Sequence, residues 1–475
     1  MIVRDKFYID GQWITPNSKA IFNLINPSDE EPCAIIGMGD SVDTDRAVQA
    51  AKQALPAFQA WTKQQRLDLL RRILQAYQEN IDEIARLMTL EMGAPITFSR
   101  NFQAMRGVAH LEEVIRVLEA FDFEWAEGTT RMRLEPIGVC ALITPWNWPM
   151  NQVIVKLAPA LAAGCTVVLK PSEFSPLSAM FLADLLHEAG VPPGVFNLIN
   201  GDGANVGAAL AAHPDVMMVS FTGSTRAGVE VARCAAPTIK RVTQELGGKS
   251  ANILLPDVDL EEAVTKGVAG CFTNSGQSCS IPTRMLIPRK LMTQAAMIAE
   301  AAAAKYSVGP AHDPQVQMGP VVNHRQFESI QAHIESGIQG GARLVIGGPG
   351  RAEPHTSGYF VRPTIFADVT PEMRIAREEI FGPVLVLIAY DSVEHAIELA
   401  NGTDYGLAGY VQGKDLEVVH DVARRLQAGT IHINYPPPDM GAPFGGYKQS
   451  GNGREWGKAG LMEYLELKSM VGFYL

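Results

Sequence analysis

Apolar residues recur every three or four positions in the first third of the chain, a spacing typical of amphipathic helices. Leu67, Leu70 and Ile73 show the pattern most clearly. Residues 1 to about 40 lack it and instead predict short strands and turns. The predicted helices cover residues 43–61, 64–91 and about 104–121.

From residue 137 onward, short apolar runs alternate with helical patterns of roughly 10 to 15 residues. This rhythm indicates βαβ units and therefore a parallel sheet. The predicted strands are 139–144, 166–170, 195–199 and 216–222, and the predicted helices are 152–163, 177–189, 204–213 and 225–235.

A second α/β series follows Gly248, and Asp259 and Glu262 have the spacing of a capping box at its first helix. Its predicted helices are 260–273, 291–306 and 323–340, and its predicted strands are 343–346 and 384–390. The segment 129–136, TTRMRLEP, alternates polar and apolar residues outside any obvious core. It is a candidate for pairing outside its own domain, and residues 463–475 are also strand-like.

Composition narrows the class of protein. The chain has 475 residues, 47% hydrophobic and 19% charged, which predicts a turn-rich α/β protein of two or three domains. A formal net charge of -11 without a long basic run argues against nucleic acid as a partner. We expect no secretory signal and no membrane span. The six cysteines are scattered and the histidines lack ligand spacing, so we expect no disulfide framework, no metal site and a cytoplasmic location.

A glycine-bounded turn marks a candidate dinucleotide site. The predicted strand 216–222 runs directly into Gly223-Ser-Thr-Arg-Ala-Gly228 and a helix. Backbone can approach a diphosphate closely at such a turn, and the helix N-terminus favours negative charge. The GxxxxG spacing is not the usual GxGxxG, and taken alone an ordinary tight βα turn is its commoner explanation.

Lys170 and Glu173 follow the strand 166–170, at the sheet edge where doubly wound folds bind ligands. Glu173 could accept from the adenosine ribose hydroxyls, and Lys170 could donate to the ribose or the diphosphate. Either residue could also be a solvated loop charge. A carboxylate facing the 2′ position repels a 2′-phosphate, which favours NAD, although Lys170 and Arg226 keep NADP possible.

Cys279 stands in the polar, turn-prone run Asn274-Ser-Gly-Gln-Ser-Cys-Ser280, whereas Cys271 lies inside an apolar helix. A lone cysteine is more often a small buried hydrophobic residue than a nucleophile, but these neighbours do not form a core. A thiolate here could attack a carbonyl carbon. The oxyanion formed would need donors. The candidates are the Cys279 backbone N–H and Asn147, which could instead be a plain turn residue.

Glu245 follows a predicted strand and precedes Leu246-Gly-Gly248. The glycines let the backbone bend sharply and leave the carboxylate room to move. A carboxylate within reach of water could act as the general base that hydrolyses a thioester. A helix cap or a surface charge is the alternative interpretation.

Together these segments resemble the aldehyde dehydrogenase superfamily. The resemblance covers about residues 8–474 and rests on motifs in order along the chain. They are PWNWP at 145–149, KPSE at 170–173, FTGS at 221–224, ELGGK at 245–249, GQSC at 276–279, EEIFGPV at 378–384 and PFGGYKQSGNGRE at 443–455.

The resemblance implies a role for individual residues. Cys279 is the expected nucleophile, Glu245 the general base, Asn147 an oxyanion donor and Lys156 a proton relay. The expected cofactor-binding residues are Ile143, Thr144, Pro145, Trp146, Lys170, Ser172, Glu173, Gly203, Phe221, Gly223, Ser224, Gly228, Leu246, Glu379 and Phe381. The expected substrate-lining residues are Trp148, Asn151, Gln152, Val155, Thr273, Ser278, Ser280 and Phe444.

The resemblance also implies the architecture and the reaction. The expected fold is α/β, with a Rossmann-type parallel-sheet cofactor domain (1–118 and 138–247), an α/β catalytic domain (248–447) and a small β oligomerisation arm (119–137 and 448–475). The arm would complete a partner subunit's sheet in a homodimer or homotetramer. An aldehyde would be oxidised to the carboxylic acid with NAD(P)+ through a hemithioacetal and a thioester on cysteine.

The sequence says less about the substrate than about the reaction. No arginine stands among the expected substrate-lining positions, which disfavours a semialdehyde with a free carboxylate. Tyr435 and Met440 flank the stiff Pro436–Pro438 loop and suggest an apolar or aromatic aldehyde. The sequence assigns the loop itself no role.

Three other functions fit the sequence less well. A CoA-acylating dehydrogenase normally lacks the glutamate base, so Glu245 argues against it. A cysteine hydrolase would need a histidine paired with Cys279, and none lies near it in sequence. A non-catalytic relative would be expected to have lost Cys279 or Glu245, and both are present.

Overall fold

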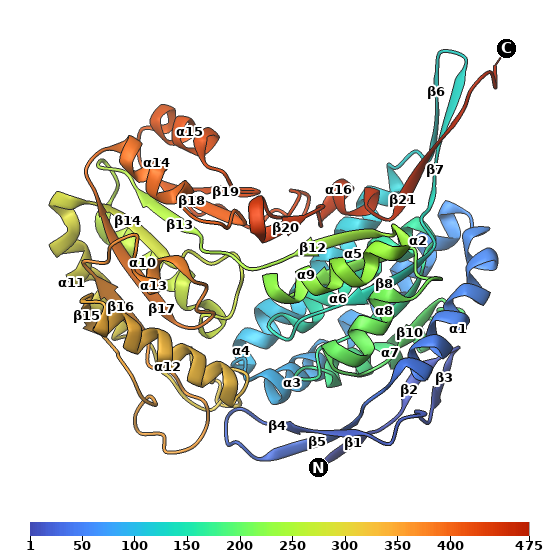
Figure 1. Ribbon diagram of the computed structural model, residues 1–475, viewed down its shortest axis with the longest axis horizontal. Helices are drawn as coiled ribbons and strands as arrows, with labels where there is room; N and C mark the ends of the chain where they lie inside the picture. Colours follow the sequence, from blue (N-terminus) through green and yellow to red (C-terminus); the bar gives the residue numbers. More distant parts are fainter. Residues whose placement is uncertain (475) are drawn as a thin grey trace.

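The computed structural model describes residues 1–474. It is an α/β protein with its two large sheets in separate lobes and a hairpin projecting from one of them (Figure 1). The lobe with an eight-stranded sheet lies on the right of Figure 1, and the lobe with a seven-stranded sheet lies on the left. This architecture confirms the predicted α/β fold class.

The eight-stranded sheet has the order β20-β12-β11-β8-β9-β10-β2-β3. Its central strands run parallel: Arg241–Glu245 (β12), Met218–Thr222 (β11), Val139–Ile143 (β8), Thr166–Lys170 (β9) and Phe196–Leu198 (β10). Antiparallel strands complete the edges: Phe7–Ile9 (β2), Gln12–Ile14 (β3) and Gly451–Asn452 (β20). In the register, Ile143 lies opposite both Lys170 and Phe221, so the carboxyl ends of three strands meet at one edge.

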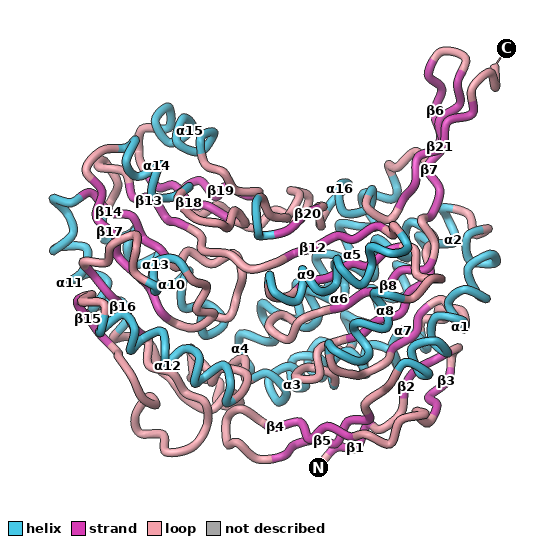
Figure 2. Tube along the Cα trace, in the orientation of Figure 1, coloured by secondary structure: helices cyan, strands magenta, loops and turns pink. Residues whose placement is uncertain are grey.

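Helices cover both faces of this sheet (Figure 2). Because side chains alternate along a strand, Cys140 and Leu142 of β8 join one apolar core, whereas Ala141 and Ile143 join the other. The first core is closed by Lys63–Glu79 (α2), Ile81–Met92 (α3), Ala104–Glu119 (α5), Pro149–Ala163 (α6) and Leu177–Glu188 (α7). The second is closed by Ser41–Gln59 (α1), Ala208–Ala212 (α8) and Thr225–Ala235 (α9).

The observed helices differ from the prediction at two places in this lobe. The single helix expected at 64–91 is two helices, because Asn80 leaves the helical conformation (φ -118°) and its side-chain amide donates to the Ala76 carbonyl (2.9 Å). Asparagine competes with the helix backbone in this way, while the apolar periodicity continues across the break. The helix expected at 204–213 begins as a π-helical segment, Gly203–Gly207 (η2), before α8.

The second lobe is built on a seven-stranded sheet, of order β15-β16-β17-β14-β13-β18-β19 and parallel except for β15. The strands are Arg343–Ile346 (β15), Thr364–Ala367 (β16), Val384–Tyr390 (β17), Arg284–Pro288 (β14), Ala251–Leu254 (β13), Ala408–Gln412 (β18) and Thr430–Ile433 (β19). Its helices are Leu260–Phe272 (α10), Met292–Ala303 (α11), His324–Gln339 (α12), Arg374–Arg377 (α13), Val393–Asn401 (α14) and Leu416–Arg425 (α15). Asp259 caps α10 by accepting from the Glu262 N–H, which is one half of the expected capping box.

Two smaller sheets complete the fold. Ile2–Arg4 (β1), Pro32–Gly37 (β5) and Ile21–Ile25 (β4) form one of them. Glu124–Glu127 (β6), Thr130–Pro136 (β7) and Leu465–Met470 (β21) form the other, which protrudes at the upper right of Figure 1. The strand predicted at 129–136 is therefore β7, and it pairs with the C-terminal strand of the same chain. No helix within residues 1–474 is both long and apolar enough to cross a membrane.

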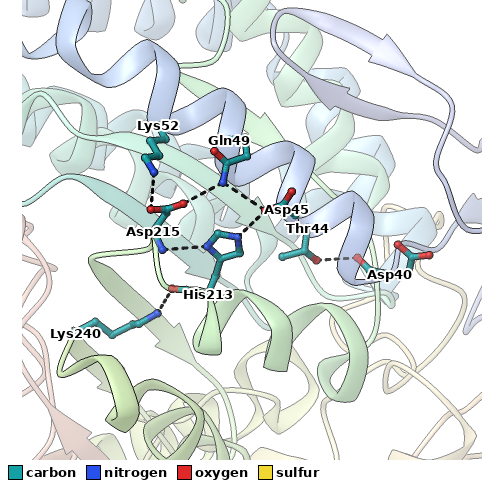
Figure 3. A network of polar contacts seen from close by, with 8 residues as sticks. All are labelled: Asp40, Thr44, Asp45, Gln49, Lys52, His213, Asp215 and Lys240. Atoms are coloured by element: carbon teal, nitrogen blue, oxygen red, sulfur yellow. Dashed lines mark hydrogen bonds and ion pairs between the residues drawn. The ribbon is translucent and has the colours of Figure 1, made fainter.

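A polar network fixes the connection between α8 and β11 against α1 (Figure 3). The Asp215 carboxylate accepts from Lys52 Nζ (2.7 Å) and Gln49 Nε2 (3.0 Å), and the Asp215 N–H donates to His213 Nδ1 (3.1 Å). Since Nδ1 accepts, the neutral ring carries its hydrogen on Nε2, which faces Asp45 (3.1 Å). The network thereby anchors the start of β11, whose other end carries the glycine-bounded turn.

Candidate active site

The Cys279 segment has a backbone shape that few sequences tolerate. It follows α10 through a tight turn, Thr273–Gly276 (η4), in which Asn274, Ser275 and Gly276 all have positive φ. A Cβ at Gly276 would run into the backbone of Gly382 in the EEIFGPV motif. Only glycine allows this approach, and it brings two distant motifs into direct contact.

The ELGGK turn packs on the other side of Cys279. A Cβ at Gly248 would collide with the Cys279 carbonyl oxygen. The cysteine side chain remains partly exposed, whereas Cys271 is fully buried and has its pKa raised by burial to about 12. Burial, followed by the nearby Glu379 and Glu245 carboxyls, raises the pKa of the Cys279 thiol. Cys271 thus has the setting of a structural residue, whereas Cys279 is partly accessible.

Asn147 lies beside the Cys279 segment and is buried, with 3% of its surface exposed. Its Nδ2 donates to the Gln277 carbonyl (3.0 Å), and its own carbonyl accepts from Asn274 Nδ2 (2.8 Å). A carboxamide has two N–H donors, so one remains for another acceptor while the first fixes the side chain. Gln103 Nε2 completes the network by donating to the Asn274 side-chain oxygen (2.8 Å).

Glu245 ends β12 and is 3% exposed, and neither carboxyl oxygen has a hydrogen-bond partner within residues 1–474. Burial raises the pKa of this carboxyl well above its usual range, and Glu455 raises it further. Gly445 leaves it room, because a Cβ there would lie 2.7 Å from Glu245 Oε1. An unpartnered carboxyl with a raised pKa fits a group that takes up a proton and changes position.

Lys156 is also buried, at 1% exposure, and forms an ion pair with Glu455. Its Nζ also contacts Ser220 Oγ on β11 (3.1 Å). Both Lys156 and Glu455 act electrostatically on Glu245. Three buried ionisable groups from β12, α6 and the C-terminal segment therefore share one site, and sequence reasoning named only two of them.

The expected adenosine-side residues gather at the carboxyl ends of β8, β9 and β11. Lys170 ends β9, its Nζ lies 3.8 Å from Glu173 Oε2, and burial lowers its pKa. The Thr144 N–H donates to the Lys170 carbonyl (3.1 Å), which continues the pairing of β8 with β9. Ser224 caps α9 by accepting from the Ala227 N–H (3.3 Å).

Other expected cofactor residues are held by local packing. A Cβ at Gly223 would clash with the Phe221 ring, and one at Gly228 would lie 2.7 Å from Leu246 Cδ2. Ser172 Oγ accepts from the Phe174 N–H (3.2 Å). Gly203 begins η2, where a Cβ would meet nothing within 4 Å, so packing does not require glycine there.

Glu379 and Phe381, from the EEIFGPV motif, contact the ELGGK turn and the PWNWP segment, respectively. Glu379 Oε1 accepts from the Gly248 N–H (2.9 Å), and burial raises its pKa to about 7. The Phe381 ring meets the face of Trp146 edge-on, with centroids 5.4 Å apart. The contact joins the PWNWP segment, including Pro145, to the EEIFGPV motif, so both lobes contribute to the expected cofactor site.

The expected substrate-lining residues divide into two groups. Trp148 Nε1 donates to Ser278 Oγ (2.6 Å), which places the indole beside the Cys279 segment. The Asn151 side chain pairs with His110 (2.9 Å), and Phe444 stacks on Trp456 (4.9 Å).

The other expected substrate-lining residues are Thr273, Ser280, Val155 and Gln152. Thr273 Oγ1 donates back to the Ala269 carbonyl of its own helix (2.9 Å), and Ser280 offers its carbonyl to Tyr410 (3.0 Å). Val155 lines a small cavity together with His110 and Trp456, and Gln152 is buried with its Oε1 unpartnered among residues 1–474. None of these contacts reaches Cys279.

A testable consequence concerns the reactivity of Cys279. Because the Glu379 carboxylate raises the pKa of the thiol, Glu379→Gln should increase the rate at which iodoacetamide alkylates Cys279 at pH 8, where Glu379 is ionised. Several-fold acceleration is expected, measured by mass spectrometry of the modified peptide. Glu398→Gln, an exposed carboxylate on α14, is the matched control. An unchanged rate in Glu379→Gln would contradict the electrostatic coupling.

A family model described as the aldehyde dehydrogenase family matches residues 13–470. The chain belongs to this family. Its activity is the oxidation of aldehydes to carboxylic acids, and the cysteine chemistry is the family's general one.

Relatives support the assignment along the whole chain. A 3-succinoylsemialdehyde-pyridine dehydrogenase from a Pseudomonas species is 50% identical over 98% of this chain and 98% of its own. A mutant of aldehyde dehydrogenase C from Pseudomonas syringae, solved with NAD+ and octanal, is 52% identical and has a TM-score of 0.98 over 99% of this chain and 97% of that chain. An aldehyde dehydrogenase from Bartonella henselae is 46% identical, with a TM-score of 0.98 over 99% of this chain and all (100%) of that one.

Sequence reasoning on this aldehyde dehydrogenase missed residues whose position depends on tertiary contact. Glu455 lies in the last motif, but the sequence does not show that it forms an ion pair with the buried Lys156. His110 and Trp456 had no local signal, because one lies on α5 and the other follows the last motif. Their rings are 5.2 Å apart.

Proposed function

We propose that this aldehyde dehydrogenase uses NAD+ and that its two lobes hold the cofactor between them. Lys170 and Glu173 would bind the adenosine ribose, the turn from Gly223 to Gly228 would face the diphosphate, and Glu379 would bind the nicotinamide ribose. Support comes from the shared strand edge, from the 3.8 Å Lys170–Glu173 pair and from the N-terminus of α9. The remaining expected cofactor residues surround these positions. When bound, NAD+ supplies the hydride acceptor.

The Cys279 thiolate would attack the aldehyde carbon, forming a sulfur–carbon bond and a tetrahedral hemithioacetal. Its negative oxygen would receive hydrogen bonds from the Cys279 N–H and the free N–H of Asn147. Loss of hydride from that carbon leaves a thioester. The position of Asn147, fixed by Gln277 and Asn274, is the observation that carries this assignment.

Glu245 would then remove a proton from a water molecule as it attacks the thioester carbon. The sulfur–carbon bond breaks, the carboxylic acid leaves and the thiolate is restored. Lys156 and Glu455, which act electrostatically on Glu245, would carry its proton away. The raised pKa of Glu245 suits this exchange, because a more basic carboxylate takes a proton from water more readily.

The substrate would enter along α5 and the Pro436–Pro438 loop. Tyr435 packs on Tyr410 of the second lobe (5.3 Å), while Met440 accepts from Arg106 Nη1 on α5 (3.5 Å). The loop is thus anchored to both lobes. Trp148, Phe444 and Met440 favour an aldehyde with an apolar or aromatic body, and the names of the relatives include both a pyridine aldehyde and octanal.

The division into domains and the assembly remain predictions. β21 and the residues after it carry exposed apolar side chains, namely Leu467, Val471 and Phe473, which supports the use of this region as an oligomerisation arm. A homodimer or homotetramer is expected by light scattering coupled to size exclusion. A cytoplasmic location likewise remains a prediction, tested by cell fractionation.

Replacing Glu173 should change the cofactor preference. Glu173→Gln removes the charge that repels a 2′-phosphate, so the ratio of kcat/KM with NAD+ to that with NADP+ should fall about tenfold. Steady-state rates with octanal and each cofactor measure this ratio. Glu188→Gln, at the exposed end of α7, should leave it unchanged. An unaltered ratio in Glu173→Gln would remove Glu173 from the cofactor site.

A further inference from the structure

Arg106 is a half-buried arginine whose guanidinium lacks an oxygen partner. It has no ion pair and no oxygen acceptor within residues 1–474, and its one side-chain hydrogen bond there is to the Met440 thioether. A guanidinium carries five N–H donors, and a thioether is a weak acceptor. Burial alone lowers the pKa of Arg106, with no carboxylate to offset it.

Other deeply set arginines do have oxygen acceptors. Arg66 Nη1 donates to the Ala162 carbonyl (2.9 Å), although Arg66 Nε has no partner within residues 1–474, and Arg284 donates to three backbone carbonyls. Arg116, an exposed arginine on the same helix as Arg106, is also paired, through two hydrogen bonds to Glu113. Because desolvating an unpaired charge is costly, the isolation of Arg106 needs a reason.

The position of Arg106 on α5 offers a reason for this isolation. Gln103, one turn earlier, donates to the Asn147 carbonyl (3.4 Å), and His110, one turn later, contacts Asn151 (2.9 Å). Residues three and four apart share a helix face, and three residues of helix advance about 4.5 Å. Arg106 therefore lies on the face of α5 that meets the oxyanion residue at one end and an expected substrate-lining residue at the other.

A row of aromatic side chains runs from Trp148 to Phe102, which lies four residues before Arg106 in the chain. Phe98 meets Trp148 edge-on (5.5 Å) and stacks on Phe102 (5.5 Å), whose side chain is 57% exposed. This row extends from the Cys279 segment to the surface. Met440, two residues after Pro438, accepts a hydrogen bond from Arg106.

We propose that Arg106 determines substrate specificity by binding a carboxylate at the far end of the aldehyde, so that the enzyme prefers aldehydes with an apolar body and a terminal carboxylate. A carboxylate would replace the weak thioether contact with charge-assisted hydrogen bonds. The inference rests on the proposed function and revises the expectation from sequence, which found no arginine because Arg106 was not among the substrate-lining positions that it named.

The test compares aldehydes of equal length with and without a terminal carboxylate. The probes are 6-oxohexanoate against hexanal and 8-oxooctanoate against octanal, with NAD+ and purified full-length enzyme. We expect at least one pair in which the wild-type kcat/KM favours the carboxylate. Arg106→Leu should lower that preference about 10- to 100-fold, mainly through KM, and leave alkanal oxidation within about threefold, as loss of a charge-assisted bond predicts. Arg106→Lys should retain part of the preference.

Arg116→Gln is the matched control, since it removes the same charge from the same helix at a position already paired, and it should leave the preference unchanged. Melting temperature and alkanal turnover establish that each variant is folded. A wild type that prefers the alkanal in both pairs, or an Arg106→Leu variant with an unaltered ratio or with equal losses for both substrates, would overturn the proposal. Failure to oxidise any aldehyde would instead contradict the proposed function.

Discussion

Cys279→Ala should abolish aldehyde-dependent NADH formation, lowering kcat by roughly four orders of magnitude or more, the scale seen when a nucleophile is removed. Without Sγ no covalent bond to the aldehyde carbon can form, and no nearby side chain replaces it, since Ser278 is engaged by Trp148 and Ser280 flanks the site through its backbone. Absorbance of NADH with octanal as substrate measures the loss.

Two controls separate chemistry from folding. Cys271→Ala removes a buried thiol that donates only to the Val384 carbonyl (3.6 Å), so it should keep most of the activity. The Cys279→Ala protein should still bind NAD+ within a fewfold of the wild-type affinity, measured by calorimetry. More than a few per cent of residual turnover in Cys279→Ala would refute the assignment of the nucleophile.

The sequence predicted the parallel strands and helices of the eight-stranded lobe because the relevant signals are local, whereas of the seven-stranded sheet it predicted only β15 and β17. Buried parallel strands such as β8, β9 and β11 are short, mostly apolar runs, and the helices between them keep one apolar face. The break at Asn80 escaped prediction because leucine and isoleucine spacing continues on both sides of it. The shape of the break depends on a single side-chain hydrogen bond to the backbone.

The sequence predicted the site residues where a chemically suitable side chain lies within a recognisable motif, as at Cys279, Glu245 and Asn147. The supporting residues could not be predicted, because their roles depend on contacts between segments that are distant in the sequence. Glu455 belongs to the site because it forms an ion pair with the buried Lys156, which is far away in the chain. Arg106 is a candidate because its guanidinium has no oxygen acceptor within residues 1–474. Hydrophobic periodicity reports that a helix has a buried face, but it does not identify the segment that covers this face.

Glu245→Gln should separate the two halves of the reaction. Glutamine has nearly the same shape but cannot remove a proton from water, so the first turnover should still form about one NADH per active site. Subsequent turnover should slow by roughly 100- to 10,000-fold, the usual contribution of a general base. Rapid-mixing absorbance resolves the burst from the steady rate, and mass spectrometry should detect the acyl group retained on Cys279.

The pH dependence provides a second readout of the same residue. Because burial and Glu455 raise the pKa of Glu245, its ionised base form grows as the pH rises, and the steady-state rate of the wild type should rise with it. Glu245→Gln should lose that rise, whereas Glu398→Gln on the surface should keep it. If the burst disappears together with the steady rate, Glu245 acts before the acyl group is formed. If the steady rate is unchanged, another group activates the water, and the role assigned to Glu245 is wrong.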